Sequence, residues 1–275
     1  MKNNRILSIQ DVSCYGQCSL TVALPILSAM GIETAILPTA ILSTHTAGFK
    51  GFTFLDLKDE LPKIEAHWHK EGLRFDAVYT GYLGNTDDIK VALSIAQSEL
   101  NEGPLIVDPA FGDGGKLYPG FDQAYVEGMV ELVRHADVLL PNLTEACALL
   151  GRPFTASPNE EKTQEILKGL HSLGVKKVIL KGIGKAEGET GIVVSDGASI
   201  QRYSHRLINQ TFHGTGDVFA SVFTAAYLSG KDALEAGTIA CDFTLSCIEN
   251  TMDDPAHRYG VKFEPLLSGL AQKLK

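Results

Sequence analysis

Residues 213–217 combine the residue types that an anion-binding helix start needs. They read His-Gly-Thr-Gly-Asp and lead into an apolar segment of helical periodicity that begins at Val218. Glycines let the backbone bring N–H groups close to a ligand, and a helix N-terminus adds unpaired donors and a dipole that favours anions. A carboxylate in the first turn is favoured in its ionised form and can accept a proton from an attacking hydroxyl group. The segment therefore predicts an anion site with an adjacent general base, formed by Gly214, Thr215, Gly216 and Asp217.

The same run of residues also has a purely structural explanation. A strand-to-helix turn with aspartate as its N-cap is common in α/β proteins, so the motif alone does not decide between the two roles. Its late place in the chain separates it from a Walker-type phosphate loop, which contains lysine and opens an early βα unit. No Gly-x-x-x-x-Gly-Lys-Ser/Thr sequence occurs in the chain.

Three carboxylates follow segments that are expected to end at one edge of a parallel sheet. Asp108 comes directly after the apolar run 105–107, at the carboxyl end of a strand, where open α/β sheets form their ligand crevice. Asp113 lies in the glycine-rich loop beyond it, and Glu145 begins a helix after the Pro-Asn pair at 141–142. Mg²⁺ prefers oxygen ligands and keeps several waters, so these residues predict a Mg²⁺ site in which one or two act through water. A turn role for Asp113 and a first-turn charge at Glu145 are the structural alternatives.

Strand-like and helical segments alternate through most of the chain, which is the pattern of βαβ units. Short apolar runs predict strands at 5–10, 33–37, 77–80, 104–107, 138–140 and 177–180. Helical periodicity predicts helices at 19–30, 86–100, 124–135 and 160–173. Strands this apolar are expected to be covered on both faces. The predicted fold class is therefore α/β, with a central, mostly parallel sheet in a three-layer αβα arrangement.

The pattern changes after residue 183. Two strand-like runs at 191–194 and 199–203, joined by an Asp196-Gly197 turn, predict a hairpin at one edge of the sheet. Three further segments, 217–229, 233–248 and 264–274, predict helices.

Length and composition are those of an ordinary globular protein. A chain of 275 residues buries a sizeable core, and we expect one domain over residues 1–275. With 44% hydrophobic and 21% charged residues, the composition suggests neither disorder nor a fibrous repeat. A formal net charge of −9 and the lack of clustered Lys and Arg argue against a nucleic-acid partner.

The chain offers no sequence signal for export or membrane insertion. Five cysteines without a CxxC pair favour a reducing compartment, so the expected location is the cytoplasm. The first eleven residues contain too short an apolar run for a signal peptide. The most apolar stretch, 19–42, is interrupted by Pro25, Glu33 and Pro38 before about 20 apolar residues accumulate, so no membrane span is expected.

Several motifs occur in the order found in one superfamily of kinases. The Gly-x-Gly-Asp helix start at 214–217 resembles the phosphoryl-transfer site of the ribokinase-like enzymes. Residues 8–10 (Ser-Ile-Gln), 43–46 (Ser-Thr-His-Thr) and 80–82 (Thr-Gly-Tyr) resemble the pyridoxal-pocket segments of the pyridoxal (vitamin B6) kinases. Segments 108–113 and 141–145 are similar to the metal and nucleotide segments of the same family. The resemblance runs from about residue 5 to about residue 250 in the family's chain order.

The resemblance implies ATP-dependent phosphorylation of the 5′-hydroxyl of pyridoxal, pyridoxamine or pyridoxine. It also implies that Asp217 is the base, that Mg²⁺ accompanies ATP, and that the enzyme is a homodimer. The residues implied for the vitamin pocket are Asp11, His45, Thr46 and Tyr82. Those implied for ATP are Asn142, Glu145 and Lys181, with Asp108, Asp113 and Glu145 at the metal.

Taken singly, these residues also have ordinary structural roles. Thr46 would be a strand residue, Tyr82 a packed aromatic with a hydrated hydroxyl, and His45 a satisfied loop histidine. Lys181 follows the buried run 178–180 and would be a solvated end residue rather than a group that neutralises phosphate charge.

The chain departs from the family pattern at two positions. Relatives often have Ser at the position of Asp11, and a carboxylate there would favour a substrate that bears an amine, so the preferred vitamer stays open. Some relatives have a hydroxyl residue at the position of Leu140, which weakens the implied monovalent-cation (K⁺) site.

Three rival functions remain, of which a sugar or nucleoside kinase is the most distant, since the fold alone does not determine the acceptor. His213 before Gly-Thr-Gly is similar to the hydroxymethylpyrimidine kinases, although those enzymes typically have Cys at the position of Asp217. A non-catalytic protein that binds vitamin B6 is the rival of a different class, and the presence of Asp217 with both motif glycines argues against it.

Overall fold

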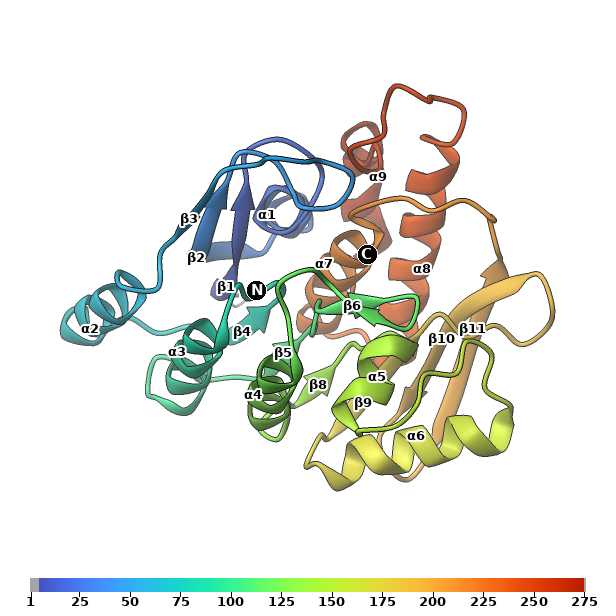
Figure 1. The fold of residues 1–275 in the computed structure, drawn as a ribbon, viewed down its shortest axis with the longest axis horizontal. Helices are drawn as coiled ribbons and strands as arrows, with labels where there is room; N and C mark the ends of the chain where they lie inside the picture. Colours follow the sequence, from blue (N-terminus) through green and yellow to red (C-terminus); the bar gives the residue numbers. More distant parts are fainter. Residues whose placement is uncertain (1–4, 275) are drawn as a thin grey trace.

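The apolar runs form one nine-stranded sheet in the computed structural model, which describes residues 5–274 (Figure 1). The strand order across the sheet is β11-β10-β9-β8-β5-β4-β1-β2-β3. The strands are β1 (Arg5–Ser13), β2 (Glu33–Leu42), β3 (Phe54–Asp56), β4 (Ala77–Thr80), β5 (Leu105–Val107), β8 (Val138–Leu139), β9 (Lys177–Lys181), β10 (Glu189–Ser195) and β11 (Ile200–Arg206). A separate ribbon consists of β6 (Gly112–Asp113) and β7 (Lys116–Leu117).

The central part of the sheet is parallel and its edges are antiparallel. β2, β1, β4, β5, β8 and β9 pair side by side in the same direction. At one edge β3 is antiparallel to β2, and at the other the β10–β11 hairpin is antiparallel to β9. The parallel strands therefore end at the same edge of the sheet, where α/β proteins form their ligand crevice.

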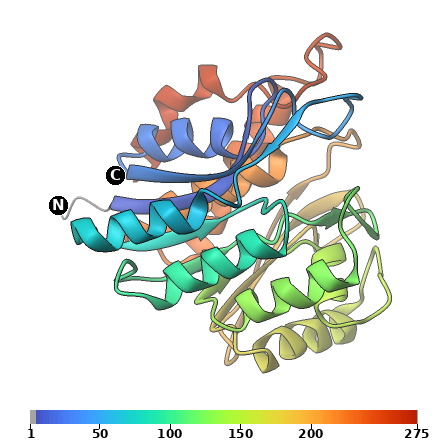
Figure 2. The ribbon, with the colours of Figure 1, turned by 60° about the vertical axis from the view of Figure 1, so that its left-hand side comes forward.

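Helices cover both faces of the sheet (Figure 2). Two separate hydrophobic clusters lie between the helices and the sheet, one on each face. One face carries α2 (Leu61–Glu71), α3 (Thr86–Gln97), α4 (Gln123–Val133), α5 (Leu143–Leu149) and α6 (Glu160–Ser172). The opposite face carries α1 (Leu20–Ala29), α7 (Thr215–Leu228), α8 (Ala233–Glu249) and α9 (Leu267–Leu270). Successive residues of β1 point to opposite clusters, as Ile6 and Leu7 do, which is why the strands are apolar throughout. No helix within residues 5–274 is long and apolar enough to cross a membrane.

The predicted α/β class with a mostly parallel sheet is confirmed, and so is the edge hairpin. The predicted helix 264–274 is wrong as a continuous element, because that segment is divided into η1 (Glu264–Leu266), α9 and η2 (Ala271–Leu274). Gly269 lies in the middle of this segment and disfavours regular α-helix there. The sequence patterns also missed β3, α2 and the β6–β7 ribbon. α2 consists mostly of polar residues and only Leu61 is fully buried, so it offers few apolar positions from which a helix can be predicted.

Candidate active site

A cavity of about 700 Å³ lies at the carboxyl ends of the parallel strands. Its walls come from segments far apart in the chain, including the ends of β1, β5 and β9 and the start of α7. All thirteen site residues predicted from the sequence line it: Asp11, His45, Thr46, Tyr82, Asp108, Asp113, Asn142, Glu145, Lys181, Gly214, Thr215, Gly216 and Asp217. The fold therefore brings the predicted residues together, while their individual roles remain predictions.

The Gly-x-Gly-Asp segment forms the N-terminus of α7, as the sequence predicted. Gly214 is the N-cap residue with a φ of 77°, and a Cβ there would lie 1.8 Å from the backbone oxygen of Gln17. Both facts exclude a side chain at this position. The first intrahelical bond of this segment runs from Val218 N–H to the Gly214 carbonyl, so the N–H groups before it have no helical partner. A cavity-facing helix start of this kind is suited to an anion.

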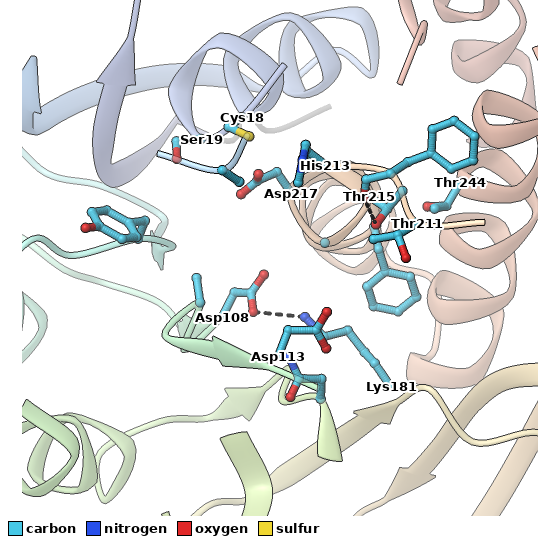
Figure 3. A pocket seen from close by; sticks show the side chains of 18 of the residues that line it. Cys18, Ser19, Asp108, Asp113, Lys181, Thr211, His213, Thr215, Asp217 and Thr244 are labelled. Atoms are coloured by element: carbon cyan, nitrogen blue, oxygen red, sulfur yellow. Dashed lines mark hydrogen bonds and ion pairs between the residues drawn. The ribbon is translucent and has the colours of Figure 1, made fainter. Parts of the chain in front are cut away.

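Asp217 lies in the first turn of α7 and projects into the cavity between the Cys18–Ser19 loop and the Asp108–Lys181 pair (Figure 3). Burial raises its pKa to about 7, and the negative charge of Asp108 acts in the same direction. A hydrogen bond from the Ser19 backbone N–H opposes this shift. A carboxylate with a pKa near neutrality is a suitable general base, because it is available in its ionised form and still holds a proton firmly.

Two residues that sequence reasoning missed have unusual backbone geometry at the cavity wall. Ser19 and Ala110 have φ values of 53° and 47°, a left-handed conformation that is uncommon for residues other than glycine. Ser19 supplies the N–H group near Asp217, and Ala110 lies between Asp108 and the β6–β7 ribbon. No sequence signal identifies either conformation, because the path of the loop sets the backbone conformation of each residue.

Lys181 is not a solvated end residue but forms a buried ion pair. Its Nζ lies 2.9 Å from Asp108 Oδ1, and the two side chains are only 15% and 4% exposed. Burial disfavours the charge of Lys181, but the carboxylates of Asp108 and Glu145 outweigh it and hold its pKa above the ordinary value. A charged lysine is therefore held inside the cavity, next to the carboxylate predicted to be a metal ligand.

Asn142 and Glu145 form a capping box at the start of α5. Asn142 Oδ1 accepts a 2.9 Å hydrogen bond from the Glu145 N–H, and Glu145 Oε2 accepts a 2.8 Å bond from the Asn142 N–H. Glu145 Oε1 also accepts from Phe111 N–H, and Asn142 Nδ2 donates to the Gly112 carbonyl. In this conformation both side chains hold the loop that leads to the β6–β7 ribbon, so the structural alternative for Glu145 is realised alongside its place in the cavity wall.

The three predicted metal ligands do not form a preassembled metal centre. Within the described part of the chain, no three His, Cys, Asp or Glu side chains lie close enough together to hold a metal ion. Asp113 is exposed and accepts a 2.8 Å bond from Gly114 N–H, Asp108 is paired with Lys181, and Glu145 caps α5. Carboxylate oxygens in a cavity wall nevertheless fit Mg²⁺, which prefers oxygen ligands and keeps several waters.

The opposite end of the cavity contains the residues predicted to bind the vitamin. Asp11 is 3% exposed and accepts a 3.0 Å hydrogen bond from Ser13 Oγ. The Tyr82 ring packs against Phe121 with centroids 5.3 Å apart, and burial raises its pKa to about 12. Thr46 lines the cavity from the loop after β2 and is not a strand residue. This end is therefore an acidic hollow with an aromatic wall.

The His45 side chain connects its loop to the Tyr259 backbone by a hydrogen bond. Its Nε2 lies 3.1 Å from the Tyr259 carbonyl, which makes Nε2 the donor because a carbonyl only accepts. Burial lowers its pKa, so it is neutral near pH 7. The His213 ring lies beside it, with centroids 5.4 Å apart. His45 is thus a loop histidine in the wall of the cavity, but it is not fully satisfied, because its Nδ1 is buried without a hydrogen-bond partner.

Cys18 lines the cavity without the properties of a nucleophile. Burial raises the pKa of its thiol well above the ordinary value, and the charge of Asp217 raises it further. The thiol therefore stays protonated near pH 7, and a covalent mechanism through Cys18 is not supported.

Comparisons with known proteins agree with this geometry. The phosphomethylpyrimidine kinase family matches residues 24–261. A hydroxymethylpyrimidine/phosphomethylpyrimidine kinase of Bacillus subtilis is 30% identical over 217 residues, which is 78% of each chain.

Two solved structures closely match the fold. A Bacteroides thetaiotaomicron protein provisionally assigned as a phosphomethylpyrimidine kinase, crystallised with pyridoxal, superimposes with a TM-score of 0.92 at 36% identity, covering 98% of this chain and 96% of the other. A pyridoxal kinase from Lactobacillus plantarum superimposes with a TM-score of 0.91 at 32% identity, covering 98% and 97%. The predicted resemblance to the pyridoxal kinases is confirmed.

Proposed function

The chain belongs to the phosphomethylpyrimidine kinase family and is similar to a pyridoxal kinase of known structure. We propose that it transfers the γ-phosphoryl group of ATP to the 5′-hydroxyl of a vitamin B6 vitamer. The observation that carries the proposal is the position of Asp217. Its carboxyl group lies within electrostatic reach of Asp11 at one end of the cavity and of Asp108 and Lys181 at the other. An acceptor hydroxyl and a phosphoryl donor bound at those two ends would meet at Asp217.

The residues then have distinct tasks. Asp217 takes the proton of the 5′-hydroxyl as that oxygen attacks the γ-phosphorus and the bond to the leaving β-phosphate oxygen breaks. The N–H groups of Gly214, Thr215 and Gly216 stabilise negative charge on the transferring group. Lys181 offers a positive charge to the phosphates.

We propose Mg²⁺ as the metal that accompanies ATP, reached by Asp108, Asp113 and Glu145 directly or through water. When bound, it would neutralise phosphate charge and help to orient the phosphates. Dependence on K⁺ stays a prediction, and the buried, apolar Leu140 beside Pro141-Asn142 argues for a weak dependence. Replacing K⁺ by a tetraalkylammonium ion in the assay tests it.

We further propose one kinase domain that acts as a homodimer in the cytoplasm. Support for one domain is the single nine-stranded sheet, which draws strands from β1 through β11. Support for a dimer is the exposure of apolar side chains on β2 and β3, at the sheet edge: Ile36, Ile41, Phe54 and Leu55. Five free thiols are consistent with a reducing compartment. Light scattering of the purified protein tests the dimer.

The deciding experiment offers Mg·ATP with pyridoxal, pyridoxamine, pyridoxine or hydroxymethylpyrimidine in parallel and identifies products by mass. We expect a B6 5′-phosphate. Phosphorylation of the pyrimidine alone would make the chain a hydroxymethylpyrimidine kinase, the alternative favoured by its 30% identical Bacillus subtilis relative. Tight vitamer binding without ATP consumption would instead indicate a non-catalytic binding protein.

A further inference from the structure

Asp11 is a buried carboxylate that the proposed chemistry leaves without a task. It lies in β1 where the register with β2 shifts between Gln10 and Val12, and it lines the cavity with 3% of its surface exposed. Burial raises its pKa, and hydrogen bonds from the Ser19 and Ser13 hydroxyls oppose that shift. Both of its hydrogen-bonding neighbours are thus neutral.

No cation of the cavity compensates the charge of Asp11. Among the described residues that line the cavity, Lys181 is the only lysine or arginine, and it pairs with Asp108 at 2.9 Å. The histidines at this end, His45 and His213, are neutral because burial lowers the pKa of both. A buried carboxylate without a cationic partner is costly unless a ligand supplies the positive charge.

Asp11 lies close enough to Asp217 for the two negative charges to repel each other. On the B6 ring the 4′ substituent and the 5′-hydroxymethyl group occupy adjacent positions, whereas the ring nitrogen lies on the opposite side from the 4′ substituent. If Asp217 receives the 5′-hydroxyl, the neighbouring carboxylate is placed for the 4′ substituent rather than for the ring N–H.

We infer that Asp11 is a specificity residue that forms an ion pair with the 4′-ammonium group of pyridoxamine and makes this vitamer the preferred acceptor. The three vitamers differ only at the 4′ position, which carries an aldehyde in pyridoxal, a hydroxymethyl group in pyridoxine and an ammonium group in pyridoxamine. Only the last provides a positive charge there. The inference rests on the proposed B6 kinase function and specifies its substrate.

Pyridoxine is the matched control substrate, because it replaces the ammonium group by a neutral hydroxyl of similar size. We expect kcat/KM for pyridoxamine to exceed that for pyridoxine by about 5- to 15-fold, the worth of a charge-assisted hydrogen bond over a neutral one. In Asp11→Asn and Asp11→Ser, the loss should fall on pyridoxamine, and the ratio of the two kcat/KM values should approach 1. The control variant Asp113→Asn, at the far end of the cavity, should change both values by the same factor and keep the wild-type ratio.

Three results would overturn the inference. The first is equal phosphorylation of pyridoxamine and pyridoxine by the wild-type enzyme. The second is an Asp11→Asn variant that keeps the preference for pyridoxamine. The third is a proportional loss of activity toward both vitamers in that variant, which would mean that Asp11 contacts a group that all vitamers share. Failure of the proposed function is a separate outcome, in which no vitamer is phosphorylated. In that case, calorimetry without ATP still tests the inference by comparing the affinities for pyridoxamine and pyridoxine. If the variants do not fold, the ratio of the wild-type kcat/KM values for the two vitamers tests it.

Discussion

Replacing Asp217 by Asn should remove activity and at the same time stabilise the protein at alkaline pH. Asn has the same shape, keeps an oxygen that can accept the Ser19 N–H and carries no charge. A general base contributes roughly 10²- to 10⁴-fold to a rate, so we expect kcat to fall by about that factor. The gain in stability follows from the pKa of about 7 in the folded protein, compared with an ordinary value of 3.8.

The magnitude follows from this difference in proton affinity. At about 1.4 kcal/mol for each tenfold change in affinity, ionised Asp217 costs the fold at most about 4 kcal/mol. Water in the cavity screens a side chain that keeps some exposure, so we expect about 2 to 4 kcal/mol. Because the folded state holds the proton more tightly than the unfolded chain, the cost is absent below pH about 4, grows as the pH rises and is complete above about 7.

Urea unfolding at pH 4.5, 6 and 8 measures this effect. The free energy of unfolding of Asp217→Asn should exceed that of the wild type most at pH 8, and the difference should shrink toward pH 4.5. Asp59→Asn is the matched control, because Asp59 is exposed on the turn before α2 and the same chemical change there should leave stability unaltered. If Asp217→Asn were no more stable than the wild type at pH 8, the claim that burial makes ionised Asp217 destabilising would be refuted. Nearly full activity of this variant would refute the role of Asp217 as the base.

Three further predictions concern the same cavity. Wild-type kcat/KM should fall about tenfold per unit as the pH decreases below about 7, because the base becomes protonated, and a profile flat down to pH 5 would contradict this. Gly214→Ala should lower the free energy of unfolding by about 2 to 4 kcal/mol through its positive φ and its contact with Gln17, whereas Gly216→Ala, whose Cβ meets no atom within 4 Å, should not destabilise the fold. Lys181→Met should lower the free energy of unfolding by about 3 to 5 kcal/mol, because it leaves Asp108 buried and unpaired. Adding Asp108→Asn should recover most of that free energy, and additive losses in the double variant would exclude coupling between Lys181 and Asp108.

The sequence identified the order of the main elements because each relies on local patterns. Apolar runs of four to six residues, such as 77–80, became strands, although β1 and β2 extend three and five residues beyond their predicted ends. The Asp196-Gly197 turn placed the edge hairpin. The capping box was also readable, since Asn142 and Glu145 have the spacing of that motif, yet its structural role was noticed only for Glu145. β3 escaped because its three residues are exposed and carry no alternation.

The partners of the charged residues could not be read from the sequence. Lys181 and Asp108 are separated by 73 positions and meet because β9 and β5 lie on either side of β8. The sequence suggested a solvated lysine as the alternative, since a residue at a strand end is usually exposed. Its actual environment depends on the cavity, which is lined by residues of α5 and α7 from opposite faces of the sheet.

The features that local rules would disfavour are concentrated around this cavity. Ser19 and Ala110 have left-handed backbone conformations, Asp11 is buried without a cation, and Asp217 has a pKa raised to about 7. Each of these features costs stability in the unliganded protein, while the two hydrophobic clusters around the sheet provide that stability. A cationic vitamer and a Mg²⁺-bound nucleotide would relieve the charge repulsion among the carboxylates. Binding of either substrate should therefore stabilise the fold.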